Sequence, residues 1–235
     1  MLHTRYVTAY QYCHNKDVLE VGCGPGLGLG YLANCARTVI GGDYTIALVQ
    51  TAQNHYRGRV GLLCLDAQIL PFKDHCFDVI ILYEAIYYLL QPDLFLKECL
   101  RLLRNDGVLL LCCANQDCPE FVGSRFGVRY FSAPDLSNML EKHGFSVELY
   151  GAFPLGPMSP KVKLISTIRR VASASSLIPG SLKGRELLKR IFYGKLSILG
   201  GEIKGEKALT NPLVPISTDF PDHDHKVLYA IARVP

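Results

Sequence analysis

The stretch "VLEVGCGPGLGLG" at residues 18–30 decides the fold of this chain. An apolar run that includes Val18, Leu19 and Val21 enters a glycine-rich turn, and a helical pattern follows from Leu27. These features predict a strand, a tight loop and the start of a helix. Such a loop brings the backbone close to a ligand and points helix N–H groups at it. Nucleotides, dinucleotides, phosphates and S-adenosyl compounds therefore all remain candidate ligands.

The spacing of the glycines argues against two of these ligand classes. The dinucleotide pattern G-x-G-x-x-G needs glycine at its sixth position, but counting from Gly22, Gly24 or Gly26 meets leucine or tyrosine there. The phosphate-binding pattern G-x-x-x-x-G-K-[ST] also fails, because no lysine follows these glycines. Pro25 removes one backbone N–H from the loop, which suits a ligand without phosphates.

Strand-like and helical patterns alternate along the first part of the chain. Several of the first five apolar runs are nearly continuous, as is typical of strands covered on both faces of a parallel sheet. The helical pattern "SAPDLSNMLEKHG" begins with Ser132 and Asp135 in capping-box spacing and ends with Gly144 as a C-cap. This alternation predicts a doubly wound α/β fold. The predicted strands are 17–23, 38–43, 60–66, 77–83, 107–114, 145–153 and 226–234.

A long segment separates the last two predicted strands. Amphipathic patterns at 161–172 and 181–194 predict a small helical insertion within it. Residues 157–207 carry a net charge of +8, although the whole chain carries only +4. We therefore expect three parts: a core at 1–153, a basic helical cap at 154–225, and a last strand at 226–235 that returns to the core sheet. If the sixth strand runs parallel to the first five, the cap would sit over the ligand-binding edge.

The cysteines and the apolar runs indicate which compartment the protein occupies and whether it binds a metal or spans a membrane. All nine cysteines lie between Cys13 and Cys118 without a C-x-x-C pair, which predicts free thiols in a reducing compartment. Cys112, Cys113 and Cys118 are the nearest approach to a metal-ligand cluster, but they lack the paired spacing of zinc sites, so we expect no metal. The sequence shows neither an uninterrupted membrane-spanning run nor a signal peptide, and we expect a cytoplasmic protein.

The acid and the glycines of the loop form a motif that the two failed patterns do not describe. Glu20, Gly22, Gly24 and Gly26 give the arrangement acidic-x-G-x-G-x-G, which resembles motif I of the class I S-adenosylmethionine-dependent methyltransferases. The resemblance extends from about Asp17 to about Phe153. Further motifs follow in the family's order and spacing: "VIGGDYT", "LDAQILPF", "FDVIILYEAIYYL" and "LRLLRNDGVLLL".

The resemblance implies a fold, a cofactor and a set of binding residues. The fold would be a Rossmann-like seven-stranded sheet, mostly parallel with an antiparallel last strand. The cofactor would be S-adenosyl-L-methionine and the product S-adenosylhomocysteine. The third motif looks like that of a small-molecule subgroup that reads D-A-x-x-L-P-F. The cofactor-binding residues implied are Glu20, Gly22, Gly24, Gly26, Asp43, Tyr44, Asp66, Ala67 and Tyr83.

Two of these positions have more specific expectations. Asp43 stands at the end of the second strand, where the family keeps an acid for the ribose hydroxyls. Independently, a carboxylate there suits a vicinal diol, because it accepts two hydrogen bonds. Asp66 and Ala67 would lie beside the adenine.

The chain departs from the family's pattern in two places. Only sixteen residues precede the first predicted strand, where the family usually has one or two helices that close over the cofactor; "TRYVTAYQYC" predicts one short helix there. This short start raises the alternative that the chain is an N-terminal fragment. After the fourth strand the family often has L-H-H, whereas Tyr87 and Tyr88 stand here. We expect these tyrosines to pack rather than catalyse.

The chemistry of methyl transfer needs few catalytic groups, because the sulfonium is already an activated leaving group and positioning supplies much of the rate. An oxygen acceptor would also need a base. The candidates are Glu84, Tyr83, His223 and His225, with a solvated acidic turn as the alternative for the two histidines.

Two missing motifs argue against a nucleobase as the methyl acceptor. "YEAI" replaces the Asn/Asp-Pro-Pro-aromatic run of amine-directed nucleobase methyltransferases, and Cys118-Pro119 reverses the Pro-Cys of cytosine-C5 enzymes. We expect a small-molecule or lipid-linked acceptor and no nucleic acid; an anionic acceptor would suit the basic segment. The basic segment could contact a membrane surface. Two rival functions stay open: a non-catalytic S-adenosyl-binding or partner-binding protein, and a nicotinamide-dependent oxidoreductase.

Overall fold

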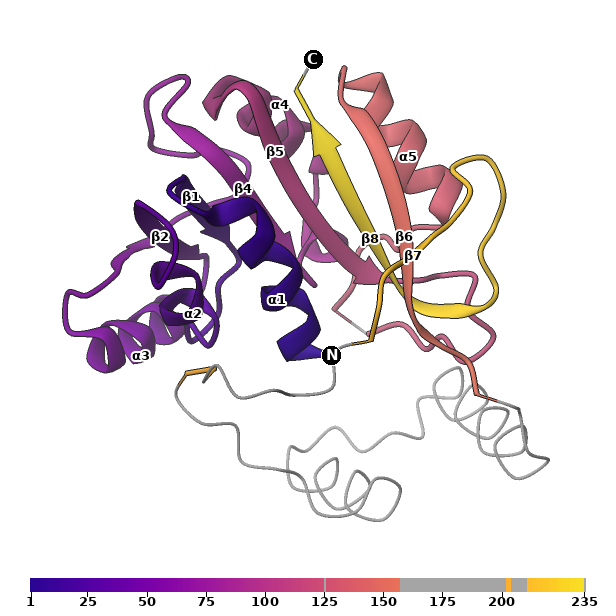
Figure 1. The fold of residues 1–235 in the computed structure, drawn as a ribbon, viewed down its shortest axis with the longest axis horizontal. Helices are drawn as coiled ribbons and strands as arrows, with labels where there is room; N and C mark the ends of the chain where they lie inside the picture. Colours follow the sequence, from indigo (N-terminus) through magenta and orange to yellow (C-terminus); the bar gives the residue numbers. More distant parts are fainter. Residues whose placement is uncertain (125, 157–201, 204–210, 235) are drawn as a thin grey trace, which may run out of the picture. The chain divides into compact units, whose positions relative to one another are not determined.

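The computed structural model describes residues 1–124, 126–156, 202–203 and 211–234. Within them, eight strands form one sheet in the order β3-β2-β1-β4-β5-β8-β6-β7 (Figure 1). The strands are β1 (Asp17–Val21), β2 (Thr38–Asp43), β3 (Gly61–Cys64), β4 (Phe77–Tyr83), β5 (Leu103–Ala114), β6 (Ser146–Pro154), β7 (Val214–Pro215) and β8 (His225–Arg233). The chain divides into two compact units, Met1–Pro154 with Gly201–Pro235, and Leu155–Gly200. The sheet belongs to the first unit.

The directions of the strands confirm the predicted Rossmann-like arrangement. The strands β1 to β5 pair in parallel, as expected for nearly continuous apolar runs. The strand β8 inserts antiparallel between β5 and β6. Consequently β6 runs in the same direction as β5, and the carboxyl ends of β1 to β6 lie at one edge of the sheet. Ligands of open α/β sheets bind at this edge.

The sheet has eight strands instead of the seven predicted. The additional strand is β7, which pairs antiparallel with Tyr150 and Gly151 of β6. A two-residue strand containing Pro215 is too short to show alternation in the sequence, and proline is tolerated at a sheet edge because it needs no ladder donor. The strand β7 falls within the predicted cap at 154–225. The boundaries of that cap stay a prediction, and its helical patterns at 161–172 and 181–194 lie outside the described residues.

Helices cover both faces of the sheet. The helices are α1 (Leu2–Cys13), α2 (Leu29–Ala33), α3 (Ile46–Tyr56), α4 (Pro92–Leu102) and α5 (Ala133–Lys142). Residues of α1, α2 and α3 pack on one face, and residues of α4 and α5 pack on the other (Figure 1). The predicted capping box is present: Ser132 Oγ accepts from the Asp135 N–H, and Asp135 accepts from the Ser132 N–H. Within the described residues, no helix is long and apolar enough to cross a membrane.

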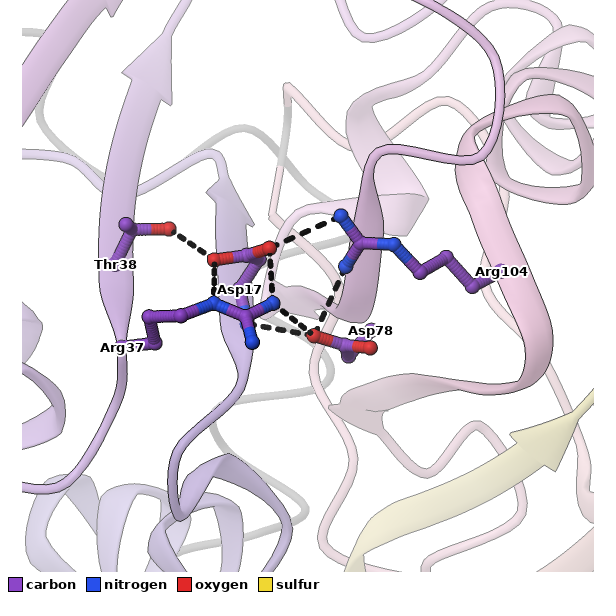
Figure 2. Close-up of polar contacts among 5 residues, drawn as sticks. All are labelled: Asp17, Arg37, Thr38, Asp78 and Arg104. Carbon is purple, nitrogen blue, oxygen red and sulfur yellow. Dashed lines mark hydrogen bonds and ion pairs between the residues drawn. The ribbon is translucent and has the colours of Figure 1, made fainter.

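Four charged side chains form a network of ion pairs at the amino edge of the sheet, opposite the glycine loop. Asp17 and Asp78 stand at the starts of β1 and β4, and Arg37 and Arg104 bridge them (Figure 2). Arg104 reaches both acids at 3.0 Å, and Thr38 donates to Asp17 at 2.8 Å. Hydrogen bonds from Arg37 hold the pKa of Asp17 well below its usual range, against the opposing effect of burial.

We expect Asp17→Asn to lower the free energy of unfolding by about 1–2 kcal/mol at pH 7, because one shared carboxylate is lost from the network. Since folding lowers the Asp17 pKa, its contribution is complete above the unfolded pKa of about 4 and declines as the pH falls below it. Urea unfolding at pH 7 and pH 3 measures this. The gap between the two proteins should narrow at pH 3, and an equal gap at both pH values would contradict this role.

Candidate functional site

The glycine loop between β1 and α2 has the left-handed backbone that its glycines permit. The φ angles are +71° at Gly22, +58° at Gly24 and +79° at Gly26, values that other residues rarely adopt. The Cys23 N–H donates to the Gly42 carbonyl at 3.0 Å, so the loop continues the pairing of β1 with β2. The predicted strand, tight loop and helix start are therefore confirmed.

A buried tyrosine of α3 holds the far side of this loop. The Tyr56 hydroxyl donates to the Gly26 carbonyl at 2.5 Å and accepts from the Gly30 N–H at 2.9 Å. A Cβ atom on Gly26 would lie 2.9 Å from the Tyr56 ring and 3.1 Å from Ala52. Gly26 thus serves close packing in the loop. The sequence pattern did not reveal Tyr56, because its contact with the loop is tertiary.

Asp43 ties the loop to the end of β2. One carboxylate oxygen accepts from the Gly24 N–H and the other from the Thr45 N–H, each at 2.8 Å. Asp43 is 9% exposed. The carboxylate therefore fixes the loop while remaining at the cavity described next.

A cavity of about 460 Å³ opens at the carboxyl edge of the parallel strands. Five residues expected to bind the cofactor line it: Gly22, Asp43, Tyr44, Asp66 and Ala67. Sequence reasoning missed the rest, although most of them are immediate neighbours of the motifs. These are Val21, Thr45, Leu65, Gln68, Leu82, Ala85, Tyr88, Leu89 and Leu90.

The chemistry of the lining selects among ligands. The described residues that line the cavity include the carboxylates of Asp43 and Asp66 but no lysine or arginine. Such a lining suits a nucleoside with a positively charged group, whereas a pyrophosphate would meet two acids without a cation. The volume lies within the range of small-molecule sites. In addition, a Cβ atom on Gly24 would meet nothing within 4 Å, so the backbone there is open to approach. S-adenosylmethionine fits this site.

Four of the residues expected to bind the cofactor do not line the cavity: Glu20, Gly24, Gly26 and Tyr83. Gly24 and Gly26 shape the loop. Glu20 is only 2% exposed, and its Oε1 accepts from the Tyr6 hydroxyl at 2.6 Å. Its Oε2 is buried and has no hydrogen-bond partner among the described residues. Burial raises the pKa of Glu20 to about 7.

Tyr83 is unsuited to the role of a general base. It is buried beneath α1, where its ring makes edge contacts with Tyr6 and Tyr229. Burial raises its pKa well above the usual value near 10, so the phenol is neutral at physiological pH. Tyr83 therefore contributes packing beneath the site.

Glu84 stands directly after β4 in an unusual backbone conformation. It follows β4 with φ +54°, between the cavity-lining residues Leu82 and Ala85. One carboxylate oxygen pairs with Arg5 of α1 at 2.6 Å, and the other accepts from the Tyr87 hydroxyl at 2.8 Å. Left-handed backbone at a non-glycine residue is costly and gathers at functional sites. None of the four candidate bases is itself a lining residue of the cavity; Glu84 is the one that directly precedes a lining residue, Ala85.

The two candidate histidines lie before and at the start of β8 and do not line the cavity. His225 is buried, and its Nδ1 contacts the Asp222 carboxylate at 3.0 Å. His223 Nδ1 contacts the Asp117 carbonyl at 2.9 Å. Asn115 donates to the carbonyl groups of Asp222 and His225, which fixes the turn. These contacts favour a structural role for both histidines.

The cysteines are all free, and most of them are buried. Cys112 and Cys113 are neighbours on β5 and belong to the apolar layers on opposite faces of the sheet. They therefore cannot share a ligand. In the part of the chain that the structure describes, no group of three or more His, Cys, Asp or Glu side chains could hold a metal ion.

Comparison with known proteins agrees with this geometry. Residues 19–111 match the family described as "Methyltransferase domain". A Mycolicibacterium smegmatis protein named "Probable S-adenosylmethionine-dependent methyltransferase" is 36% identical over 143 residues, which cover 58% of this chain and 54% of that protein. A Coxiella burnetii "Ubiquinone biosynthesis O-methyltransferase" is 28% identical over 129 residues, covering 54% of this chain and 55% of that one. The chain thus spans about half the length of the curated relatives it matches.

A solved structure supports the fold over the whole chain. The YcgJ protein of Bacillus subtilis superposes with a TM-score of 0.62 at 17% identity, covering 100% of this chain and 99% of that one. This likeness concerns the fold alone. Residues 19–111 of this chain thus match the methyltransferase-domain family, and its fold is similar to that of the solved structure.

Proposed function

We propose that this chain transfers the methyl group of S-adenosylmethionine to a small-molecule or lipid-linked acceptor. The observation that carries the proposal is the cavity at the carboxyl edge, whose lining in the described part of the chain has two carboxylates and no lysine or arginine. It is joined to a glycine loop whose spacing fails the dinucleotide pattern. Among the described residues, this lining contains no lysine or arginine that would neutralise a pyrophosphate, which argues against a nicotinamide-dependent oxidoreductase.

Different residues around the cavity would contact different parts of the cofactor. Asp43 would accept hydrogen bonds from the ribose hydroxyls, since each of its oxygens keeps a second lone pair beyond its backbone partner. Asp66 and Ala67 would lie beside the adenine, and Gly22 would bring its backbone against the ligand. When bound, S-adenosylmethionine supplies a methyl group on a sulfonium leaving group. The chain's own part is to hold the acceptor in line and exclude water.

Glu84 is the polar group that we assign to the acceptor. Its carboxylate is oriented by Arg5 and Tyr87, and it directly precedes the cavity-lining residue Ala85. A hydroxyl acceptor could donate its proton toward this carboxylate as the methyl group is transferred. Glu84 would act by orienting the nucleophile as well as by accepting its proton.

The rim of the cavity favours an acceptor with an apolar part. Tyr44 and Leu90 line the cavity and are 78% and 75% exposed, and Ile69, next to Gln68 of the lining, is 75% exposed. Exposed apolar groups gathered at a cavity mouth are typical of binding surfaces. A quinone precursor, as in the name of the Coxiella burnetii relative, is one acceptor of this kind. Contact of the basic segment 157–207 with a membrane surface stays a prediction.

Transfer of a labelled methyl group tests the proposal. The full chain is incubated with methyl-labelled S-adenosylmethionine and a panel of phenols, catechols, prenylated phenols and fatty acids. We expect label on at least one acceptor, and we expect Glu84→Gln to lower kcat about 10–100-fold because it removes the proton acceptor. Glu148→Gln, on β6, is the matched control and should keep full activity. If the wild-type protein binds S-adenosylhomocysteine but labels nothing, the non-catalytic binding protein becomes the better account.

A further inference from the structure

A tyrosine of the first helix touches the glycine loop at two points. The Tyr6 hydroxyl donates to Glu20 Oε1 at 2.6 Å, inside the protein. The ring of Tyr6 packs against Gly28 so closely that a Cβ atom there would lie 1.9 Å from it. Glu20 precedes the glycine loop on β1, and Gly28 ends it at the start of α2. Tyr6 thus spans the loop from its first acid to its last glycine.

The partner of this tyrosine is an isolated buried carboxylate. Glu20 has one oxygen bonded to Tyr6 and one oxygen without a partner among the described residues. Burying a carboxylate with one oxygen unpartnered is costly, so the hydrogen bond from Tyr6 is the polar contact that holds this side chain. The titratable and charged groups that face Glu20 are Arg5, Tyr6 and Cys13 of α1, Cys23 of the loop, Asp43 of β2, Tyr56 of α3 and Tyr83 of β4.

We propose that Tyr6 is a positioning residue of the cofactor site, which through its hydroxyl and its ring holds Glu20 and the glycine loop in the arrangement that binds S-adenosylmethionine. This inference rests on the proposed function. Tyr6 itself does not line the cavity, so it acts through Glu20 and Gly28. The first helix therefore contributes to the site from beneath the loop.

The contact also sets the charge of Glu20. Burial raises the pKa of Glu20 to about 7, and the hydrogen bond from Tyr6 opposes this rise because it stabilises the ionised carboxylate. Glu20 does not line the cavity, but its negative charge lies at the base of the glycine loop, and in its ionised form it would favour the positively charged part of the cofactor from a distance. Cofactor affinity should consequently rise with pH through about 7. Removing the hydroxyl of Tyr6 should move this rise to higher pH.

The test compares Tyr6→Phe with the wild-type chain. Phenylalanine keeps the ring against Gly28 and removes only the hydroxyl. The titration of Glu20 is followed by NMR of its labelled carboxyl carbon, and binding of S-adenosylhomocysteine is measured by calorimetry from pH 6 to pH 8.5. Tyr10→Phe is the matched control, because Tyr10 lies on the same helix and its ring faces Tyr31.

We expect the titration midpoint of Glu20 to rise by about one pH unit in Tyr6→Phe and to stay in place in Tyr10→Phe. Affinity for S-adenosylhomocysteine should fall about fivefold at pH 7 but less than twofold at pH 8.5, as the fraction of ionised Glu20 requires. An unchanged Glu20 titration, or equal weakening at every pH, would overturn the role of Tyr6. If the wild-type chain binds no S-adenosylhomocysteine at any pH, the proposed function itself fails.

Discussion

Asp43→Ala should weaken binding of S-adenosylhomocysteine about 100-fold or more. The substitution removes two hydrogen bonds from backbone N–H groups to a carboxylate, at Gly24 and Thr45, and it also removes the acceptor assigned to the ribose. Hydrogen bonds to charged groups contribute roughly 1.5–3 kcal/mol each, so losing the ribose contact and the fixed loop together, about 3 kcal/mol or more, exceeds a 100-fold effect. Calorimetric titration of both proteins measures the ratio.

Two controls separate binding from folding in this experiment. Asp43→Asn keeps one carbonyl oxygen for the loop and should give an intermediate affinity, because its amide nitrogen cannot accept from the second N–H. Thermal unfolding shows whether Asp43→Ala is folded at the temperature of the titration. A folded Asp43→Ala protein with wild-type affinity would contradict the assignment of this carboxylate to the cofactor.

Gly26→Ala should damage the protein more than Gly24→Ala. Both positions have positive φ, which costs an alanine about 1–2 kcal/mol. At Gly26 the new methyl group would also meet Tyr56 at 2.9 Å and Ala52 at 3.1 Å, and overpacking adds about 1–3 kcal/mol. At Gly24 it would meet nothing within 4 Å. We expect losses in the free energy of unfolding of about 2–5 kcal/mol for Gly26→Ala and about 1–2 kcal/mol for Gly24→Ala.

Urea unfolding of the two variants at pH 7 gives this comparison directly. Both substitutions add the same methyl group, at positions two residues apart in one loop. The difference in stability between them therefore reports the contact of the Gly26→Ala methyl group with Tyr56 and Ala52. The double variant with Ala52→Gly should recover part of the loss at Gly26, less the cost of glycine within a helix. Equal stabilities for Gly24→Ala and Gly26→Ala would show that the close approach of α3 to the loop is not a constraint.

The parts of the site that the sequence predicts are those that local pattern specifies. Gly22 and Asp66 come just after β1 and β3, Asp43 ends β2, and the carboxyl ends of parallel strands meet at one edge. Apolar runs without alternation identify those strands before any contact is known. For this reason the Rossmann-like order and the position of the cavity could be predicted together.

The remaining features depend on contacts between distant residues. Glu20 and Tyr83 were expected at the cofactor, but they lie in the layer beneath α1, since alternation along β1 and β4 turns their side chains away from the cavity. No sequence periodicity predicts the hydrogen bond of Tyr6 with Glu20, or that of Arg5 with Glu84, which is 79 residues away in the sequence. The strand β7 was not predicted because two residues are too few to show a strand pattern.

The central claim is tested most directly by titrating S-adenosylhomocysteine and, separately, NADH into the full chain by calorimetry. The cavity, lined among the described residues by two carboxylates and by no lysine or arginine, predicts that S-adenosylhomocysteine binds in the micromolar range at one site and that NADH gives no heat of binding. Binding of NADH without S-adenosylhomocysteine would contradict the account of the cavity and, with it, the proposed methyl transfer.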